Sequence, residues 1–263
     1  MNRFAISLLI GITLPLGGVF GQSSVTLDQA LLLKVVLEDK PSGEPSAIRD
    51  LAKKALGQEF EVSRYTEFYK RLGADVSVKS DIQISKVLGY VGGIDKVSRS
   101  SSGFFRDGRF MPLQVTEQRG SSKPIYAAQI DHKKKRIAYL KGQTLVKEES
   151  FQGDLTDLIQ LPYRWLGGPV VSKSFRTSIT DARKIYRNEE FIANDMEVMF
   201  LGQKTAVVRF ARKRQSADDE GIEFWVRKRD GLPIRIIVTL NKKYGLKIDA
   251  APYRQSEIIV KKN

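Results

Sequence analysis

The stretch DHKKKR, residues 131–136, places the only histidine of the chain beside four consecutive cations. Side chains of these types could bind nucleic acid, help to build a catalytic site, or keep a surface turn in water. A serine–histidine–carboxylate triad needs a group that orients the imidazole ring, and His132 has no obvious partner of this kind except its sequence neighbour, Asp131. We therefore expect a solvated turn.

The remaining composition excludes several kinds of site. The chain has no cysteine and a single histidine, which excludes thiol nucleophiles, disulfides, thiolate metal sites and multi-histidine metal sites. Neither a glycine-rich phosphate loop nor a nucleophile elbow occurs in the sequence. We expect no catalytic residues, no cofactor and no metal ion, and we predict that the protein is not an enzyme.

Two groups of acidic residues lie close together in the sequence. Asp154 and Asp157 suit the capping of a helix, and the acidic residues 218–220 fall in a charged loop, 211–221. Two other carboxylates, distant in sequence, could still meet as an acid/base pair. A carboxylate-dependent hydrolase of cell-wall or envelope polymer is therefore the alternative function.

Three residues are candidates for ligand binding: Trp165, Trp225 and Arg235. Trp165 follows an apolar segment that ends at a proline. Trp225 and Arg235 should stand opposite each other on the outer face of a hairpin. We favour a cation–π pair facing solvent for them, and a contact surface for a lipid or a partner protein is the functional alternative.

The N-terminus, MNRFAISLLIGITLPLGGVFG, has the pattern of a secretory signal peptide. Arg3 precedes an apolar run, and Val19 and Gly21 fit a small-residue cleavage motif, so cleavage is predicted after Gly21. A membrane anchor is disfavoured because proline and a glycine pair interrupt a run already short for a bilayer. We expect a periplasmic or secreted protein with no lipid-anchor cysteine and no transmembrane span in the mature chain.

The charge of the chain is strongly positive, at +14. Removal of Arg3 with the signal peptide leaves 43 cations against 30 anions, a net charge of +13. Such a charge usually suggests nucleic acid. An exported protein rarely meets nucleic acid, so we exclude that partner and expect a lipid, another envelope component or an envelope protein.

From residue 58 onward, short runs of β-branched and aromatic residues alternate with polar ones and end at turn residues, which predicts an antiparallel meander. Residues 22–57 are predicted as a helical extension, because apolar residues in 46–57 recur at helical spacing. The preceding TLDQALLLKVVLED fits a helix or a strand. The expected domains are therefore 1–21 (signal peptide), 22–57 (helical extension) and 58–263 (β domain).

Loop lengths fix the register of two hairpins. A four-residue loop at 132–135 puts Ile130 opposite Ile137 on the buried face and Asp131 opposite Arg136 as an ion pair, whereas a loop one residue longer would bury Arg136. A three-residue loop, 229–231, puts Val226 opposite Ile234 with Gly231 in the left-handed conformation.

GDLTDLIQLPYRWLGG, residues 153–168, is predicted as a short helix laid on the sheet, capped by Asp154 and ended by Pro162. The expected fold is therefore mainly β: a strongly curved antiparallel meander, either a half-barrel or an open barrel, with one short helix on the sheet and the N-terminal helical extension.

Three segments, GFFRDGRFMPLQVTEQRG, GDLTDLIQLPYRWL and FWVRKRDGLPIRIIVTL, occur in this order. So arranged, they resemble an exported bacterial β-rich family, the domain of unknown function 3108, from about residue 59 to the C-terminus. The resemblance implies an envelope protein with a curved antiparallel sheet and implies no activity. FWVRKRDGLP is also similar to the last hairpin of periplasmic lipoprotein carriers, half-barrels that hold acyl chains.

We therefore predict an exported envelope protein that binds an apolar or amphipathic ligand, or a partner protein, without catalysis. The alternatives are the carboxylate-dependent hydrolase and a structural or assembly factor recognised through a sheet edge.

Overall fold

The computed structural model describes residues 24–37, 53–54, 57–84, 95–106, 108–213, 221–241, 246–256 and 258–261. Most of them lie in strands. In chain order, the strands and the 3-10 helix η1 are β1 (Ser24–Leu37), β2 (Glu59–Leu72), β3 (Asp75–Gln83), β4 (Lys96–Arg106), β5 (Arg109–Arg119), β6 (Tyr126–Asp131), β7 (Arg136–Lys141), β8 (Thr144–Ser150), β9 (Leu155–Asp157), η1 (Leu161–Tyr163), β10 (Phe175–Thr180), β11 (Ile185–Phe200), β12 (Gln203–Arg212), β13 (Gly221–Arg227), β14 (Pro233–Asn241), β15 (Leu246–Pro252) and β16 (Ile258–Lys261).

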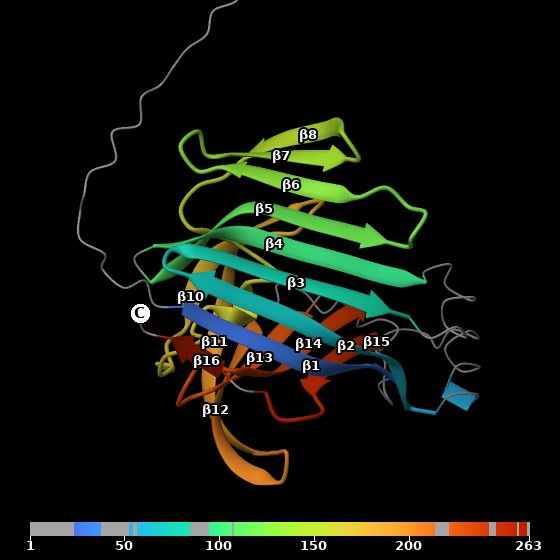
Figure 1. Cartoon of the computed structure of the whole chain (residues 1–263), viewed down its shortest axis with the longest axis vertical. Coiled ribbons are helices and arrows are strands. Elements are labelled where there is room, and N and C mark those ends of the chain that lie inside the picture. The colour runs from blue at the N-terminus through green and yellow to red at the C-terminus, as the bar shows by residue number, and fades with distance from the viewer. Residues whose placement is uncertain are drawn as a thin grey trace, which may run out of the picture.

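All strands belong to one sheet, in the order β8-β7-β6-β5-β4-β3-β2-β1-β15-β14-β13-β12-β11-β10-β9, with β16 paired to the start of β1. The pairs are antiparallel except β9–β10, which is parallel. Figure 1 shows the sheet running from β8 down to β1 and continuing behind that layer through β14 and β13. The predicted mainly β, curved antiparallel sheet is confirmed.

The two ends of the sheet approach each other without strand pairing. The hydroxyl of Tyr139 on β7 lies 3.0 Å from that of Thr180 on β10. Arg187 on β11 donates hydrogen bonds to the carbonyl oxygen of Ser150 at 2.6 Å and to the Glu149 carboxylate at 3.1 Å, both on β8. Side chains therefore bridge the edges of an open, curved sheet.

The segment between β8 and β10 fills the concave side of this sheet. Its buried side chains belong to the same core cluster as residues from both halves of the sheet, and Tyr163 stacks on Tyr69 with ring centroids 5.4 Å apart. The concave side is therefore occupied by protein in the described part of the chain, unlike the acyl-chain cavity of a lipoprotein-carrier half-barrel. The contributing side chains are Leu155, Ile159, Tyr163 and Leu166 from the segment, with Val25, Tyr69, Val207 and Ile234 from the strands.

The predicted helix at 153–168 is wrong. Its residues form the short strand β9, the 3-10 helix η1 and turns. The carboxylate of Asp157, rather than that of Asp154, accepts hydrogen bonds from the backbone N–H groups of Ile159 and Gln160 at 2.8 and 3.0 Å, and this contact turns the chain directly after β9. The predicted position is correct, because η1 packs on β13 and β14.

The predicted helical extension at 22–57 is also wrong for residues 24–37, the longest part of it that the structure describes. Ser24–Leu37 form β1, which pairs with β2 on one side and with β15 and β16 on the other. A strand in the middle of a sheet can be apolar on both faces, so its sequence loses the alternation that marks a strand. Residues 53–54 are helical, and 38–52 and 55–56, like the predicted signal peptide 1–21, lie outside the described residues.

The register predicted for the first hairpin is confirmed, with Ile130 opposite Ile137 and Asp131 opposite Arg136. The expected ion pair between the last two is replaced by other contacts. The Asp131 carboxylate accepts the N–H groups of Lys133 and Lys134, both at 2.9 Å, and Arg136 pairs with a glutamate on β8.

The second hairpin is confirmed in part. Phe224 faces Ile236 and Trp225 faces Arg235 as predicted, but a register shift after Trp225 puts Val226 opposite Pro233 instead of Ile234. Gly231 has the expected left-handed conformation, with φ of 71°.

Replacing Gly231 with alanine is expected to lower the free energy of unfolding by more than about 2 kcal/mol. An added Cβ would overlap the backbone carbonyl of Trp165, so the hairpin could no longer pack against the segment that follows η1. Gly142→Ala is the matched control, because Gly142 has φ of 62° and nothing within 4 Å of an added Cβ. Urea denaturation should show a clearly smaller loss for the control, and equal losses would contradict the packing argument.

Candidate functional site

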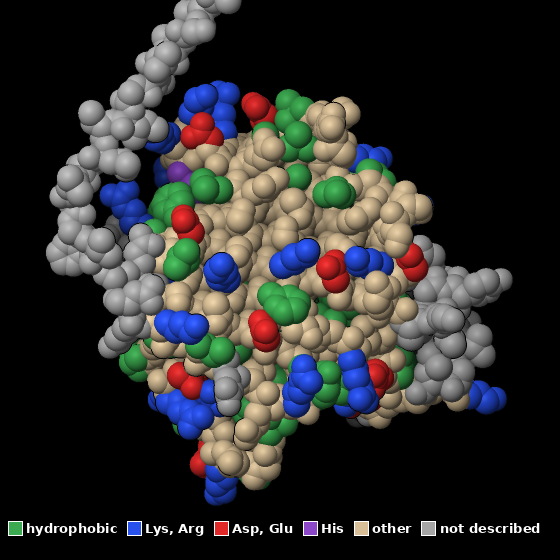
Figure 2. Space-filling model, viewed as in Figure 1, with side chains coloured by type: hydrophobic (Ala, Val, Ile, Leu, Met, Phe, Trp, Pro, Cys, Tyr) green, Lys and Arg blue, Asp and Glu red, His purple; other side chains and the backbone are tan. Residues whose placement is uncertain are grey.

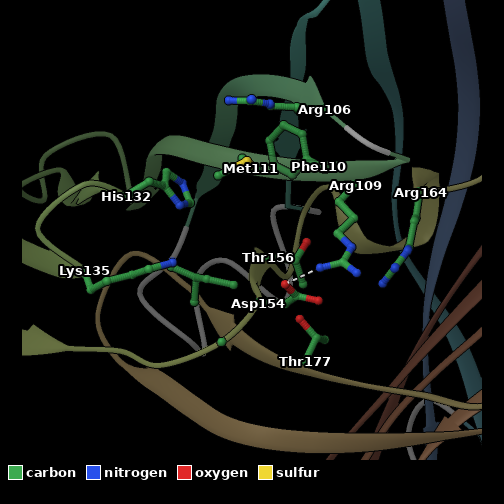
Figure 3. Close-up of a pocket in the computed structure, with 12 residues that line it drawn as sticks. Arg106, Arg109, Phe110, Met111, His132, Lys135, Asp154, Thr156, Arg164 and Thr177 are labelled. Atoms are coloured by element: carbon green, nitrogen blue, oxygen red, sulfur yellow. Dashed lines mark hydrogen bonds and ion pairs between the residues drawn. The ribbon is translucent and has the colours of Figure 1, made fainter.

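A cleft of about 330 Å³ opens where the β4–β5 hairpin, the tip of the β6–β7 hairpin and the chain around β9 meet. Figure 3 shows polar side chains on two sides of the cleft, with Arg109 and Arg164 on one and His132 and Lys135 on the other. Its lining residues are Arg106, Arg109, Phe110, Met111, His132, Lys135, Gly153, Asp154, Leu155, Thr156, Arg164 and Thr177. We call it the cationic cleft.

The strand pattern of β4 and β5 explains one wall of the cleft. Arg106 and Arg109 face each other across the turn that joins the two strands, and both are exposed. Phe110, the next residue, is buried because successive side chains on a strand point to opposite faces. The hairpin therefore contributes two guanidinium groups beside an apolar base.

His132 lies in a turn, as predicted, but the prediction that its side chain is solvated is wrong for the imidazole ring. The ring is half-buried and lies edge-on to Phe104 and Phe151, and its Nε2 donates to the carbonyl oxygen of Pro112 at 2.7 Å. Burial lowers the pKa of His132, so the ring is neutral at pH 7. The lysines of the stretch are exposed, as predicted, and Lys135 lines the cleft.

The cleft has an excess of positive charge. Its lining includes four cations and one carboxylate, Asp154, which Arg109 engages at 2.6 Å (Figure 3). Arg164 is half-buried, with its guanidinium carbon 4.8 Å from the centroid of the Phe175 ring. Burial lowers the pKa of Arg164, Asp154 raises it, and the charge of Arg109 lowers it by less. An anion in the cleft would be attracted by two guanidinium groups that Asp154 alone faces among the described lining residues.

On the face viewed in Figure 2, the other described cations do not form a continuous stripe. Figure 2 shows lysine and arginine side chains spread over the viewed face among acidic ones. Many of the described cations form ion pairs, for example Arg209 with Glu223 and Arg212 with Glu189. This distribution differs from the clustered basic patch typical of a nucleic-acid interface.

Glu67 and Asp157 are the most deeply buried carboxylates of the described residues, and neither lines the cationic cleft. Glu67 is 1% exposed and contacts Arg99 at 2.8 Å, and its other oxygen accepts the hydroxyl of Tyr163 at 2.5 Å. Asp157 is 0% exposed and accepts the hydroxyl of Ser101 at 2.8 Å. Both carboxylates are held by neighbouring groups, and neither lines the cationic cleft or three other clefts in the described part of the chain. We interpret them as structural.

Replacing Asp157 with asparagine is expected to stabilise the protein above pH 6. Burial raises the pKa of Asp157 to about 6 from 3.8, so the folded state binds the proton more tightly than the unfolded state. The resulting stabilisation is complete below about pH 4 and is lost as the pH rises through 6. Two pKa units correspond to at most about 3 kcal/mol.

Urea denaturation of the variant at about pH 7.5 should therefore give a free energy of unfolding about 1–3 kcal/mol above that of the wild type, with no gain at about pH 4. The amide can keep the contacts of Asp157 with Ser101 and the backbone. A variant that is less stable than the wild type at the higher pH would show that the charged form is needed.

The structure brings Trp225 and Arg235 together and places Trp165 elsewhere. Trp165 packs in the core, stacked on Phe210 with centroids 4.4 Å apart. Trp225 and Arg235 form the predicted cation–π contact, 4.7 Å from guanidinium carbon to ring centroid, and line a different cleft of about 360 Å³. Arg235 is engaged there by Asp249. Their role as ligand-binding residues stays a prediction.

Sequence reasoning missed the arginines of the cationic cleft. Arg106 and Arg109 flank one turn, but nothing in the sequence links them to Arg164. The DHKKKR stretch was the available signal, since His132 and Lys135 belong to the cleft.

Among the described residues, no group of three or more histidine, aspartate or glutamate side chains could hold a metal ion. No helix in that part of the chain is long and apolar enough to cross a membrane.

No protein-family model and no curated protein matches the chain. Among solved structures, it is similar to the β-barrel-like protein of domain of unknown function 1849 from Brucella abortus. The TM-score is 0.38 and the identity 10%, over 91% of this chain and 98% of that chain. A likeness of this size bears on neither ligand nor activity. The resemblance to the domain of unknown function 3108 stays a prediction.

Proposed function

We propose that the protein is an exported, non-enzymatic binding protein whose cationic cleft holds the anionic head group of an amphipathic ligand. The observation that carries the proposal is the group of cations Arg109, Arg164 and Lys135 in the cleft, where Asp154 is the one carboxylate among the described lining residues. The exposed guanidinium group of Arg109 and the half-buried one of Arg164 suit a phosphate or carboxylate, which they can bind through charge-assisted hydrogen bonds.

The apolar residues of the cleft support an amphipathic ligand over a fully hydrophilic anion. Phe110 and Leu155 are buried and Met111 is half-buried, so one part of the lining can contact hydrocarbon. The volume of about 330 Å³ lies at the lower end of the range for small-molecule sites. We infer that the head group and the first part of a chain bind here, because the concave side of the sheet is filled.

A hydrolase mechanism has less support. The cationic cleft contributes one carboxylate, which is ion-paired with Arg109. The cleft beside Trp225 contains Glu59 and Asp249, and these are engaged by Lys34 and Arg235 respectively. A glycosidase needs a pair of carboxyl groups free to act on the substrate, whereas these three carboxylates are already engaged in ion pairs.

A sheet edge favours the assembly factor as a second candidate. β8 is the last strand of the sheet, and its residues Leu145 and Val146 are exposed. An unpaired strand edge can accept a strand from a partner. Replacing Val146 with proline should abolish such pairing. If the variant pulled down a partner as efficiently as the wild type, recognition through the β8 edge would be excluded.

Isothermal titration with dodecyl phosphate and with the neutral detergent dodecyl maltoside tests the main proposal. The two probes share their alkyl chain and differ in head-group charge. We expect dodecyl phosphate to bind at least about tenfold more tightly, with an affinity that falls as salt is added. Equal affinity for both probes, or no binding of the phosphate, would contradict a cleft selective for anions.

A further inference from the structure

The hairpin formed by β11 and β12 places apolar side chains at its exposed tip. Figure 1 shows this hairpin projecting beyond the rest of the sheet. Met199 and Leu201 are 67% and 39% exposed, whereas Val198 and Phe200, which alternate with them, are half-buried against the core. One face of the tip therefore packs on the protein, and the other offers apolar side chains to its surroundings.

The turn itself contains an unfavourable residue. Phe200 pairs with Gln203, so Leu201 and Gly202 form a two-residue loop, with φ of 47° and 80°. Two-residue loops with positive φ at both positions favour asparagine or aspartate before glycine, and a leucine in the left-handed region costs about 1–2 kcal/mol. The chain therefore tolerates local strain to keep a large apolar side chain at the end of a projecting hairpin. Residues that oppose the local backbone preference in this way are typical of functional positions.

Cations lie next to the tip. Phe200 and Leu201 line a cleft of about 810 Å³ together with Lys204, Lys228 and Arg229. Arg227 also lines this cleft and shares Asp230 with Arg229, while Lys228 contacts Asp195. These ion pairs therefore set two aspartates against three of the four cations. Apolar side chains that project from a surface beside cations match a bilayer with anionic head groups, which attracts the cations and accepts the apolar tip.

We propose that the tip of the β11–β12 hairpin docks the protein on the surface of an anionic lipid bilayer, with Met199 and Leu201 entering the interfacial region. A convex tip suits a membrane better than a protein partner, which would require complementary shape. The proposal does not depend on the cationic cleft, whose residues lie elsewhere in the fold.

Flotation with vesicles of equimolar phosphatidylcholine and phosphatidylglycerol tests this proposal, with pure phosphatidylcholine vesicles as the neutral comparison. The full chain is expressed, intact mass spectrometry records whether residues 1–21 remain, and all proteins are compared in the same form. The wild type should float with the anionic vesicles and bind the neutral ones less. Met199→Thr/Leu201→Asn should lower the vesicle partition coefficient about tenfold or more, because two apolar side chains are lost.

The same variant separates membrane docking from a structural role. Leu201→Asn puts a favoured residue in the turn, so thermal unfolding should occur at the same or a higher temperature. Leu145→Asn is the matched control: Leu145 is 53% exposed on β8, and its loss should leave flotation unchanged. Unchanged flotation of the double variant would overturn the proposal. It would also be overturned if the wild type did not float and sedimentation velocity showed a dimer that the variant loses.

Discussion

Replacing Arg99 with methionine is expected to lower the free energy of unfolding by about 3–5 kcal/mol at neutral pH. The substitution removes the cation that contacts the carboxylate of Glu67 at 2.8 Å. That carboxylate stays buried and keeps the hydrogen bond that it accepts from the Tyr163 hydroxyl. An unpaired charge in the core is among the most destabilising changes that one substitution can produce. Chemical denaturation followed by circular dichroism measures the loss.

Two further variants identify the cause of that loss. Glu67→Gln in the Arg99→Met background removes the charge and keeps an oxygen that can accept the Tyr163 hydroxyl, so more than half of the lost stability should return. Arg64→Met is the control, because Arg64 pairs with Glu61 at the surface, and its stability should stay close to that of the wild type. A loss that the second substitution does not restore would point to packing rather than charge.

Replacing both Arg109 and Arg164 with glutamine is expected to weaken the binding of dodecyl phosphate about 10- to 100-fold. The two guanidinium groups lie on one side of the cationic cleft, and the change also leaves Asp154 without the partner that it has at 2.6 Å. Binding of dodecyl maltoside, which has no charge, should change by less than about threefold. Isothermal titration of both probes measures these differences.

Lys133→Gln/Lys134→Gln is the matched control for this loss of charge. It removes the same number of cations from the neighbouring hairpin tip, but neither lysine lines the cleft. We expect nearly wild-type affinity for this control. If the two double variants weakened binding equally, the net charge of the protein, and not the cleft, would be responsible. Thermal unfolding of each variant confirms that it is folded, since Arg164 also packs on aromatic rings.

The hairpins could be predicted from the sequence because burial and loop length act together. A change of one residue in the loop at 132–135 would have buried Arg136, so the register followed from the cost of burying a charge. The same reasoning failed beyond Trp225 in the second hairpin, where an irregularity in the strand pair shifted Val226 to Pro233. Nothing in the local sequence indicates that shift.

The helical predictions failed where local signals are ambiguous. LLLKVVL in β1 lies between two strands of the sheet, so apolar residues occur on both faces and the period of two disappears. In 153–168, the capping residue was of the expected type but stands at Asp157, and the contacts that stabilise β9 come from β10, some twenty residues later in the chain. Tertiary contacts overrode a short helical pattern.

The cationic cleft was not predictable, for a related reason. Its cations come from β4, β5, the β6–β7 turn and the residue after η1, and only the curvature of the sheet brings them together. The sequence did indicate that His132 belongs to a turn, but not that its ring lies inward against Pro112. A histidine at the end of a hairpin can reach either solvent or the core, and its apolar neighbours, Phe104 and Phe151, are distant in sequence.

The most direct test of ligand binding in the cationic cleft uses the single histidine of the chain as a reporter. All imidazole signals in a nuclear magnetic resonance spectrum come from His132, whose ring lines the cleft. We expect dodecyl phosphate to shift these signals in a saturable way, with the dissociation constant found by titration calorimetry, and dodecyl maltoside to leave them in place. Histidine signals that do not move while dodecyl phosphate binds would show that the anion is held elsewhere.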